Sequence, residues 1–393
     1  MNLTQQQKQT NIASLRFLTF ANFGYVLAIP VMVDYVNNHA TGGSESYFYI
    51  ITITNALSII LAPFIGAYSD FYSRRAMLVT SMFCKILAWL LFLIFPGFET
   101  FTIGFALLLV GVDMCNTSAC LFETMTAAGN QRDYRKEEQK IYAYPQYALM
   151  VGLPISGFLY ATNPAWPFIL NIVIAAIGII AACYYTEAPR KKTNHTNPLA
   201  LLKDALLFLK NTRRLRWLTL YKGIILAMMS IMIFVFQARF LEIGGSVTTF
   251  SILITAVYLI RGISAQQAER LFRYTSHPIN ALAFILVGSC IVLFLTGIST
   301  SLWVFTTFML IYMIFRGLQK PCLNFIHNDL LSSDKRATAF AASSLSARFG
   351  KVIFNLIAGI TIASFGANVT LVLISFAAAI IGGLLLWLLK RTY

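Results

Sequence analysis

Long apolar segments recur along the whole chain, and short polar or charged connections separate them. A helix that crosses a lipid bilayer needs about 20 predominantly apolar residues, and twelve segments of this kind can be placed on the sequence. They are 15–36, 47–69, 76–95, 101–126, 140–161 and 166–186 in the first half, and 216–240, 247–267, 277–297, 301–326, 338–363 and 367–389 in the second. The pattern predicts an all-α membrane protein with twelve transmembrane helices.

Two kinds of connection alternate between these segments. One kind contains almost no Lys or Arg and comprises 37–46, 96–100, 162–165, 241–246, 298–300 and 364–366. The other kind is basic and includes Arg74 and Arg75, Arg132 to Lys140, Arg190 to Arg216, Arg270 and Arg273, Lys335 and Arg336, and the tail with Lys390 and Arg391. Because loops rich in Lys and Arg stay in the cytoplasm, the alternation predicts a multi-pass protein of the cytoplasmic (inner) membrane with both termini in the cytoplasm.

A polar, basic linker at 187–215 divides the chain into two halves, 1–186 and 216–393. We expect each half to form a six-helix bundle, with pseudo-symmetry between the two bundles. Repeated halves with a site at their interface are typical of secondary transporters. Within the linker, leucines recur at helical spacing over 198–210, which predicts an amphipathic helix on the inner leaflet; a regulatory docking site is the alternative.

The composition excludes several classes of protein. The chain has 393 residues, of which 58% are hydrophobic and 11% charged, and its mean hydropathy is +0.70. Soluble domains average about 25% charged residues, so a soluble enzyme, a disordered protein and a disulfide scaffold are all disfavoured. The net charge of +15 is explained by basic loops that face anionic lipid. Membrane lipid, rather than nucleic acid, is therefore an expected partner.

The sequence offers little for catalysis or metal binding. Its six cysteines lie in apolar stretches and form no CxxC pair, and its four histidines are scattered. It contains no GxxxxGK[ST] phosphate loop, no HExxH and no GxSxG pattern. We therefore expect no enzyme activity, no ATP coupling within the chain, no cofactor and no metal site. Because the first apolar run is long enough to span the bilayer, we expect no removable signal peptide.

The connection after the second segment carries a distinctive pattern. It reads Gly66-Ala67-Tyr68-Ser69-Asp70-Phe71-Tyr72-Ser73-Arg74-Arg75, with an Asp four residues after a Gly and a basic pair beyond the turn. The pattern resembles the signature of the major facilitator superfamily, and the twelve segments and the central linker agree with it. The resemblance implies that Gly66, Asp70, Arg74 and Arg75 form a latch that holds the two halves in the outward-facing state.

Three features depart from the family's patterns. Phe71 and Ser73 stand where a basic residue and a glycine are usual, which implies a weaker or differently partnered latch. The run Gly152-Leu153-Pro154-Ile155-Ser156-Gly157 is similar to, but an incomplete form of, a Gly-Pro-rich motif of family antiporters. Where drug antiporters of the family tend to have Arg and then Gln, this chain has Asp113 and Asn116.

Ten ionisable residues fall within or at the ends of the apolar segments. Such residues usually face a cavity or a partner, because a charge in lipid is energetically costly. They are Asp34, Lys85, Asp113, Glu123, Arg239, Arg261, Arg316, Lys320, Arg348 and Lys351. Seven of the ten are cationic, so the three carboxylates cannot neutralise all of them.

Two pairs of cations each share one face of a helix. Arg316 and Lys320 are four residues apart, and Arg348 and Lys351 are three apart. We expect these four side chains to line a hydrated cavity that binds an anionic solute, with Asn116 as a further polar ligand. Alternatively, Lys320 reaches the inner interface with its ammonium group, and Arg316 pairs with Asp113 or Glu123 of the first half.

Three carboxylates are candidates for proton coupling. Asp113 lies near the centre of the fourth segment, where burial would favour its protonated form; a structural pairing with Arg316 is the alternative. Glu123 lies near the inner end, where a gate ion pair with Arg132 or Lys351 is equally well supported. Asp34 lies near the outer end of the first segment and is either an outer-gate residue or exposed at the interface.

These observations favour a secondary active transporter that works as a monomer by alternating access, coupled to protons, and moves a small organic anion. A carboxylate, a phosphorylated compound and a carboxylate-type siderophore all fit the predicted cation cluster. A proton-driven multidrug efflux antiporter is the first alternative, since segments rich in Phe, Met and Tyr would form an adaptable apolar cavity. A non-transporting membrane sensor or assembly factor is the second.

Overall fold

The computed structural model describes residues 3–23, 27–40, 45–71, 73–130, 134–187, 213–275, 277–329 and 336–392. At some of these positions only the backbone is described, among them 66–71, 142–147, Lys320 and 336–344. The segment 198–210, for which we predicted an amphipathic helix, lies outside the described residues. The described residues divide into two compact units, one within Met1–Thr41 and Ile60–Pro198 and the other within Gly42–Ile59 and Leu199–Tyr393.

The first unit contains the helices of the first half of the chain and the second part of α3. These helices are α1 (Gln5–Phe23), α2 (Ile29–His39), α3 (Glu45–Phe71), α4 (Arg74–Ile94), α5 (Phe98–Met114), α6 (Thr117–Ala127), α7 (Tyr134–Thr162) and α8 (Trp166–Tyr184). Residues 45–59 of α3 group with the second unit, whereas the sequence placed the whole of 1–186 in one bundle.

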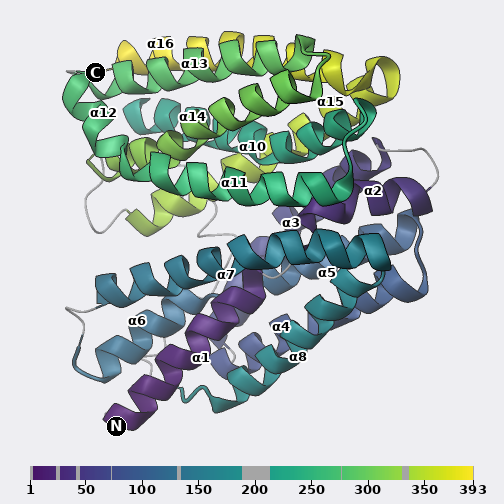
Figure 1. The fold of residues 1–393 in the computed structure, drawn as a ribbon. Helices are drawn as coiled ribbons and strands as arrows, with labels where there is room; N and C mark the ends of the chain where they lie inside the picture. Colours follow the sequence, from purple (N-terminus) through teal and green to yellow (C-terminus); the bar gives the residue numbers. More distant parts are fainter. Residues whose placement is uncertain are drawn as a thin grey trace. The chain divides into compact units, whose positions relative to one another are not determined.

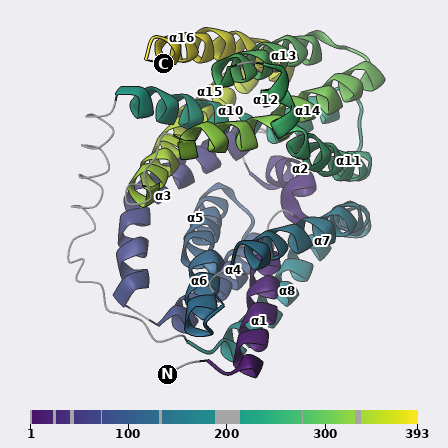
Figure 2. The same cartoon turned by 90° about the vertical axis from the view of Figure 1, so that its left-hand side faces the viewer.

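The second unit contains the helices that follow the linker. They are α10 (Arg213–Glu242), α11 (Val247–Gln266), α12 (Ala268–Tyr274), α13 (Pro278–Ile298), α14 (Leu302–Asp329), α15 (Arg336–Ala377), the π-helix η3 (Ala378–Gly382) and α16 (Gly383–Lys390). Figure 1 and Figure 2 both show α10, α13, α14 and α15 packed together.

The regular structure of the described residues is helical, as the apolar segments predict. Within these residues, eight helical segments are long and apolar enough to cross a membrane, and one of them, Leu345–Lys390, contains two of the predicted spans. Large apolar side chains cover the outer faces of the helices, and Phe83, Ile103 and Ile291 are each more than half exposed. The chain is a multi-pass helical membrane protein; the count of twelve spans and the orientation of the termini stay predictions.

The fourth predicted span consists of two helices. Residues Cys115 and Asn116 separate α5 from α6, with φ near −83° and ψ of 65° and 72°. The Asn116 N–H donates to Met114 O, and the Thr117 N–H donates to Cys115 O, both at 3.0 Å. These are two successive inverse γ-turns, which interrupt the i→i−4 hydrogen-bond ladder. Irregular backbone of this kind is tolerated in a membrane only where protein or a water-filled cavity surrounds it.

In the first unit, α4 packs between α5 and α8. A Cβ atom at Gly111 of α5 would lie 2.9 Å from Ser81 O, and one at Gly178 of α8 would lie 2.8 Å from Met82 Sδ. Glycine at these positions lets the helix backbones approach closely, which is a common way to pack membrane helices. The buried Asn11 on α1 donates to Thr186 O at 2.8 Å, which ties α1 to the segment after α8.

In the second unit, α10 packs along α15, and α14 packs against both α11 and α13. A Cβ atom at Gly350 of α15 would lie 2.7 Å from Ala227 Cβ of α10. A Cβ atom at Gly317 of α14 would lie 2.6 Å from Arg261 O of α11. The second contact brings the backbones of α11 and α14 together beside two arginines.

The turn between the last two predicted spans depends on a glycine. Gly366 has φ of 82° and ψ of 171°, a conformation essentially restricted to glycine. The Ala367 N–H next to it donates to Glu242 Oε1 at 3.1 Å, and Glu242 also pairs with Arg239 at 3.2 Å. The turn is therefore held to the end of α10.

Gly366→Ala is expected to lower the free energy of unfolding by about 1–3 kcal/mol, because alanine is strained at this φ and ψ. The midpoint of thermal unfolding of the purified protein in detergent measures the change. Gly383→Ala is the matched control: Gly383 is helical, with φ of −62°, and a Cβ atom there meets open space. An equal loss in both variants would contradict the explanation.

Candidate functional site

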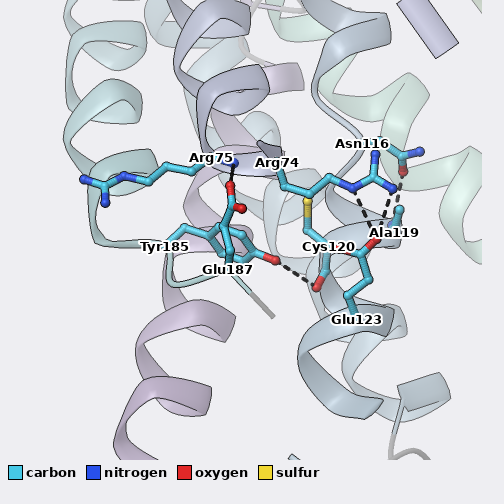
Figure 3. Close-up of polar contacts among 8 residues, drawn as sticks. All are labelled: Arg74, Arg75, Asn116, Ala119, Cys120, Glu123, Tyr185 and Glu187. Atoms are coloured by element: carbon cyan, nitrogen blue, oxygen red, sulfur yellow. Dashed lines mark hydrogen bonds and ion pairs between the residues drawn. The ribbon is translucent and has the colours of Figure 1, made fainter. Parts of the chain in front are cut away.

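Arg74 of the predicted latch forms an ion pair within the first unit. It lies in the first turn of α4, and its guanidinium group contacts Glu123 Oε1 on α6, with Nη2 at 3.0 Å and Nε at 3.2 Å (Figure 3). Both side chains are largely buried, with 11% and 19% of their surface exposed. The pair joins the first turn of α4 to the second half of α6. It gives Glu123 an identified cationic partner.

Glu187, after α8, contacts the start of α4. The Ser73 hydroxyl donates to Glu187 Oε1, and the backbone N–H of Arg75 donates to the same oxygen at 2.8 Å. Ser73 also accepts a hydrogen bond from the Ala76 N–H at 3.1 Å and so caps the helix. Serine therefore has a structural use at the position where the family pattern has glycine. The Arg75 side chain itself is exposed.

The other two predicted latch residues, Gly66 and Asp70, lie near the end of α3. Their backbones are helical, and their side chains lie outside the described part of the structure. The latch function of the four residues stays a prediction.

Asp113 and Asn116 flank the break between α5 and α6. Asp113 occupies the last turn of α5 and is partly buried. Asn116 is exposed and caps α6, where its side-chain oxygen accepts a hydrogen bond from the Ala119 N–H at 3.1 Å (Figure 3). The structure thus places Asp113, the candidate proton carrier, beside an interruption of the helix.

Lys85 is a buried cation of the first unit with neutral partners. Its side chain is 2% exposed, and its ammonium group donates to Asn22 Oδ1 and, at 3.4 Å, to Ala21 O. Both acceptors belong to the last turn of α1, where carbonyl groups lack helical donors. The C-terminal end of a helix also carries partial negative charge, which favours a cation. Lys85 therefore stabilises the end of α1.

Asp34 lies on α2 and is held by neighbouring polar groups. Tyr160 on α7 donates its hydroxyl to Asp34 Oδ2 at 2.8 Å, and Asn38 donates to the same oxygen at 3.3 Å. The three predicted proton-coupling residues thus lie on different helices, α2, α5 and α6.

Arg316 is placed against a second arginine. It lies on α14, and its guanidinium Nη1 is buried without a hydrogen-bond partner among the described residues. Arg261 on α11 lies close enough to repel it electrostatically, and Tyr258 and Tyr312 lie close enough to stabilise it. Arg261 and Arg316 each lie 14 residues after the first residue of their helices, α11 and α14. Each is therefore about 21 Å from the start of its helix. The Arg261 guanidinium also lies 5.3 Å from the centre of the Tyr258 ring.

Arg348 and Lys351 lie on α15 and face a different helix. The Arg348 Nη1 donates to Ser58 O on α3 at 3.3 Å, and both side chains are partly buried. Asn355, one turn further on, is 1% exposed and donates to Lys351 O at 2.7 Å. The Lys320 side chain lies outside the described part of the structure. The structure thus brings the predicted cations Arg316 and Arg348 against different helices.

The comparisons with solved structures show the fold. The chain aligns with the crystal structure of the nucleoside transporter NupG over 98% of its own length and 99% of that chain, with a TM-score of 0.76 and 12% sequence identity. At this identity the likeness concerns the fold alone.

Two curated relatives are similar in sequence. The uncharacterized MFS-type transporter YxaM of Bacillus subtilis (strain 168) is 25% identical over 156 residues, which are 38% of this chain and 38% of that protein. Multidrug resistance protein 2 of the same organism is 24% identical over 210 residues, 51% of this chain and 50% of that protein. The chain thus spans half or less of the length of these relatives. No model of a known protein family matches the chain.

These findings agree with the resemblance seen in the sequence. The chain has the fold of the nucleoside transporter NupG, and the two curated proteins that it is similar to are named as an MFS-type transporter and a multidrug resistance protein.

Arg74→Ala is expected to lower the free energy of unfolding by about 1–2 kcal/mol, because Glu123 loses a charged hydrogen-bond donor. Arg75→Ala is the matched control, since it removes an exposed side chain and keeps the backbone N–H that binds Glu187. Thermal unfolding of the two purified variants measures the difference. Equal midpoints would show that the Arg74–Glu123 pair contributes nothing to stability.

Proposed function

We propose that the chain is a secondary active transporter of the cytoplasmic membrane that moves a small organic anion by alternating access, coupled to protons. The pairing of Arg261 with Arg316 carries this proposal. Two like charges in adjacent membrane helices repel each other, and an anion bound between them would offset this repulsion.

The sequence around Arg261 and Arg316 contains few acidic residues that could neutralise the two arginines from within the protein. Between Ile243 and Asn328 it contains one acidic residue, Glu269, eight positions after Arg261 on the short helix α12. Among the described residues, Tyr258 and Tyr312 stabilise the charge of Arg316 electrostatically, without a hydrogen bond to its Nη1. A guanidinium group binds carboxylate or phosphate through two parallel hydrogen bonds, so a bound anion would satisfy the buried Nη1 of Arg316.

Arg316→Gln is expected to weaken the binding of an anionic substrate by about 10- to 100-fold, since it removes a charged hydrogen-bond donor. The substrate is first found by a thermal-shift screen of the purified protein against carboxylates, phosphorylated compounds and lipophilic cations, because a specific ligand stabilises the folded state. Arg270→Gln, which removes an exposed arginine of α12, should leave the affinity unchanged.

Stabilisation by lipophilic cations alone would reject the anion proposal. It would favour multidrug efflux, the alternative supported by the similarity to multidrug resistance protein 2.

The variant Glu269→Gln tests whether the two arginines are neutralised by Glu269 or by a bound anion. If Glu269 neutralised the arginines, this variant would lower stability and raise the affinity for anions. We expect instead that the affinity for anions does not change.

Asp113→Asn is expected to remove the dependence of transport on the proton gradient while substrate binding persists. The reason is its position at the interrupted helix, where a carboxylate can exchange a proton with a cavity. Transport by protein reconstituted in liposomes, measured with and without an imposed pH gradient, tests this. Asp34→Asn serves as the comparison, and an unchanged response to the gradient in Asp113→Asn would assign the coupling elsewhere.

A further inference from the structure

Arg316 is the middle residue of a polar stripe on α14. The stripe consists of Tyr312, Arg316 and Gln319, which are spaced i, i+4 and i+7 and therefore share one helix face. Tyr312 is 0% exposed and Gln319 is 1% exposed. The Tyr312 hydroxyl and both polar atoms of the Gln319 amide are buried without a hydrogen-bond partner among the described residues.

Tyr221 on α10 adds a further unsatisfied hydroxyl beside the stripe. It is 0% exposed, and its oxygen also lacks a hydrogen-bond partner among the described residues. Tyr221 and Tyr312 both lie within electrostatic reach of Cys290 on α13, and Tyr221 also lies within reach of Cys322, three residues after Gln319. The unsatisfied groups therefore gather where α10, α13 and α14 meet, the region that Figure 1 shows at the centre of the second unit.

The proximity of these unsatisfied groups to one another needs an explanation. A buried polar group without a hydrogen bond costs about 1–3 kcal/mol, and in a membrane the lipid offers no replacement. Structures of proteins contain few such groups, and each one needs an explanation. Tyr312 and Gln319 share a helix face with Arg316, and one explanation covers them together with Tyr221, which is that a ligand held by the arginine also carries the missing hydrogen-bond partners.

The chemistry of the three side chains indicates what those partners are. A phenol hydroxyl donates and accepts, and a carboxamide offers two donors and one acceptor. Tyr312 and Gln319 lie about 6 Å and about 4.5 Å from Arg316 along the helix axis, on opposite sides of it. A ligand whose acid group binds Arg316 must therefore extend several ångströms beyond that group and carry groups that both donate and accept.

We propose that the transported anion bears hydroxyl groups beside its acid group, as hydroxycarboxylates, sugar acids and sugar phosphates do. Arg316 binds the acid group, and Tyr312, Gln319 and Tyr221 bind the hydroxyl groups. This inference rests on the proposed function and specifies its substrate class. It distinguishes the ligand from simple carboxylates, alkyl phosphates and apolar drugs.

The test compares ligands that differ only in their hydroxyl groups. Gluconate is compared with hexanoate, and glycerol 3-phosphate with propyl phosphate. Calorimetry measures the affinity of each ligand for the purified full chain in lipid nanodiscs. We expect at least one hydroxylated member to bind 10-fold or more tightly than its partner. Tyr312→Phe and Gln319→Leu should each reduce that ratio about 2- to 10-fold, with the affinity for the partner lacking hydroxyls unchanged.

Tyr184→Phe is the matched control, since Tyr184 is 67% exposed at the end of α8; it should keep the full ratio. The ligand-free stability of Tyr312→Phe is a second measurement. It should equal or exceed that of the unmodified chain, because the change removes an unsatisfied hydroxyl. A large loss of stability would show that this hydroxyl has a partner within the protein and would overturn the inference.

The remaining outcomes separate the inference from the function on which it rests. If the two members of each pair bind equally well, the hydroxyl preference is wrong and the anion transporter stands. If neither member of either pair binds, while other anions stabilise the protein, the preference is again wrong. If no anion of any kind binds, the proposed function is wrong and this inference is wrong with it.

Discussion

Hydrocarbon offers no hydrogen bonds, and this constraint determines most of the structure. Each backbone N–H and C=O within the bilayer must be satisfied inside the protein, so the apolar segments form helices. Apolar surface cannot bring these helices together, because lipid is equally apolar, and close packing does so instead. The approaches at Gly111, Gly178, Gly317 and Gly350 are examples, since a Cβ atom at any of them would lie within 3 Å of a neighbouring helix.

The same constraint makes the cations within the helices informative, because each needs a hydrogen-bond acceptor or a counter-ion inside the protein. Arg74 pairs with a carboxylate on α6, and Lys85 donates hydrogen bonds to oxygen atoms at the end of α1. Arg348 donates to a backbone carbonyl of α3. Arg316 differs from these three: a second arginine lies beside it, and one of its nitrogen atoms is buried without a partner in the described structure. This difference is the reason that our proposal assigns ligand binding to Arg316 rather than to the other three.

The sequence predicted the helices well, because the length and apolar character of a segment are local properties. It also identified Arg316 as a buried charge. It could not identify Arg261 as the neighbour, since that depends on where α11 and α14 approach each other at Gly317. The Arg74–Glu123 pair could have been predicted, because the predicted topology puts both residues at the inner ends of adjacent segments. The break in the fourth segment had a weak signal in Asn116, Thr117 and Ser118, a run of residues that favour helix caps.

The two γ-turns between α5 and α6 have a mechanical consequence. Helix α4 is bonded to both sides of the break, through Ser81 to the carbonyl of Gly111 at 2.6 Å and through Arg74 to Glu123. The first bond lies before the turns and the second lies after them. Helix α6 is also tied to α1, because the Thr19 hydroxyl donates to Thr117 Oγ1 at 2.9 Å. These bonds brace α6 against both α4 and α1, so the break redirects the chain without detaching α6 and keeps Asp113, in the last turn of α5, beside the two turns.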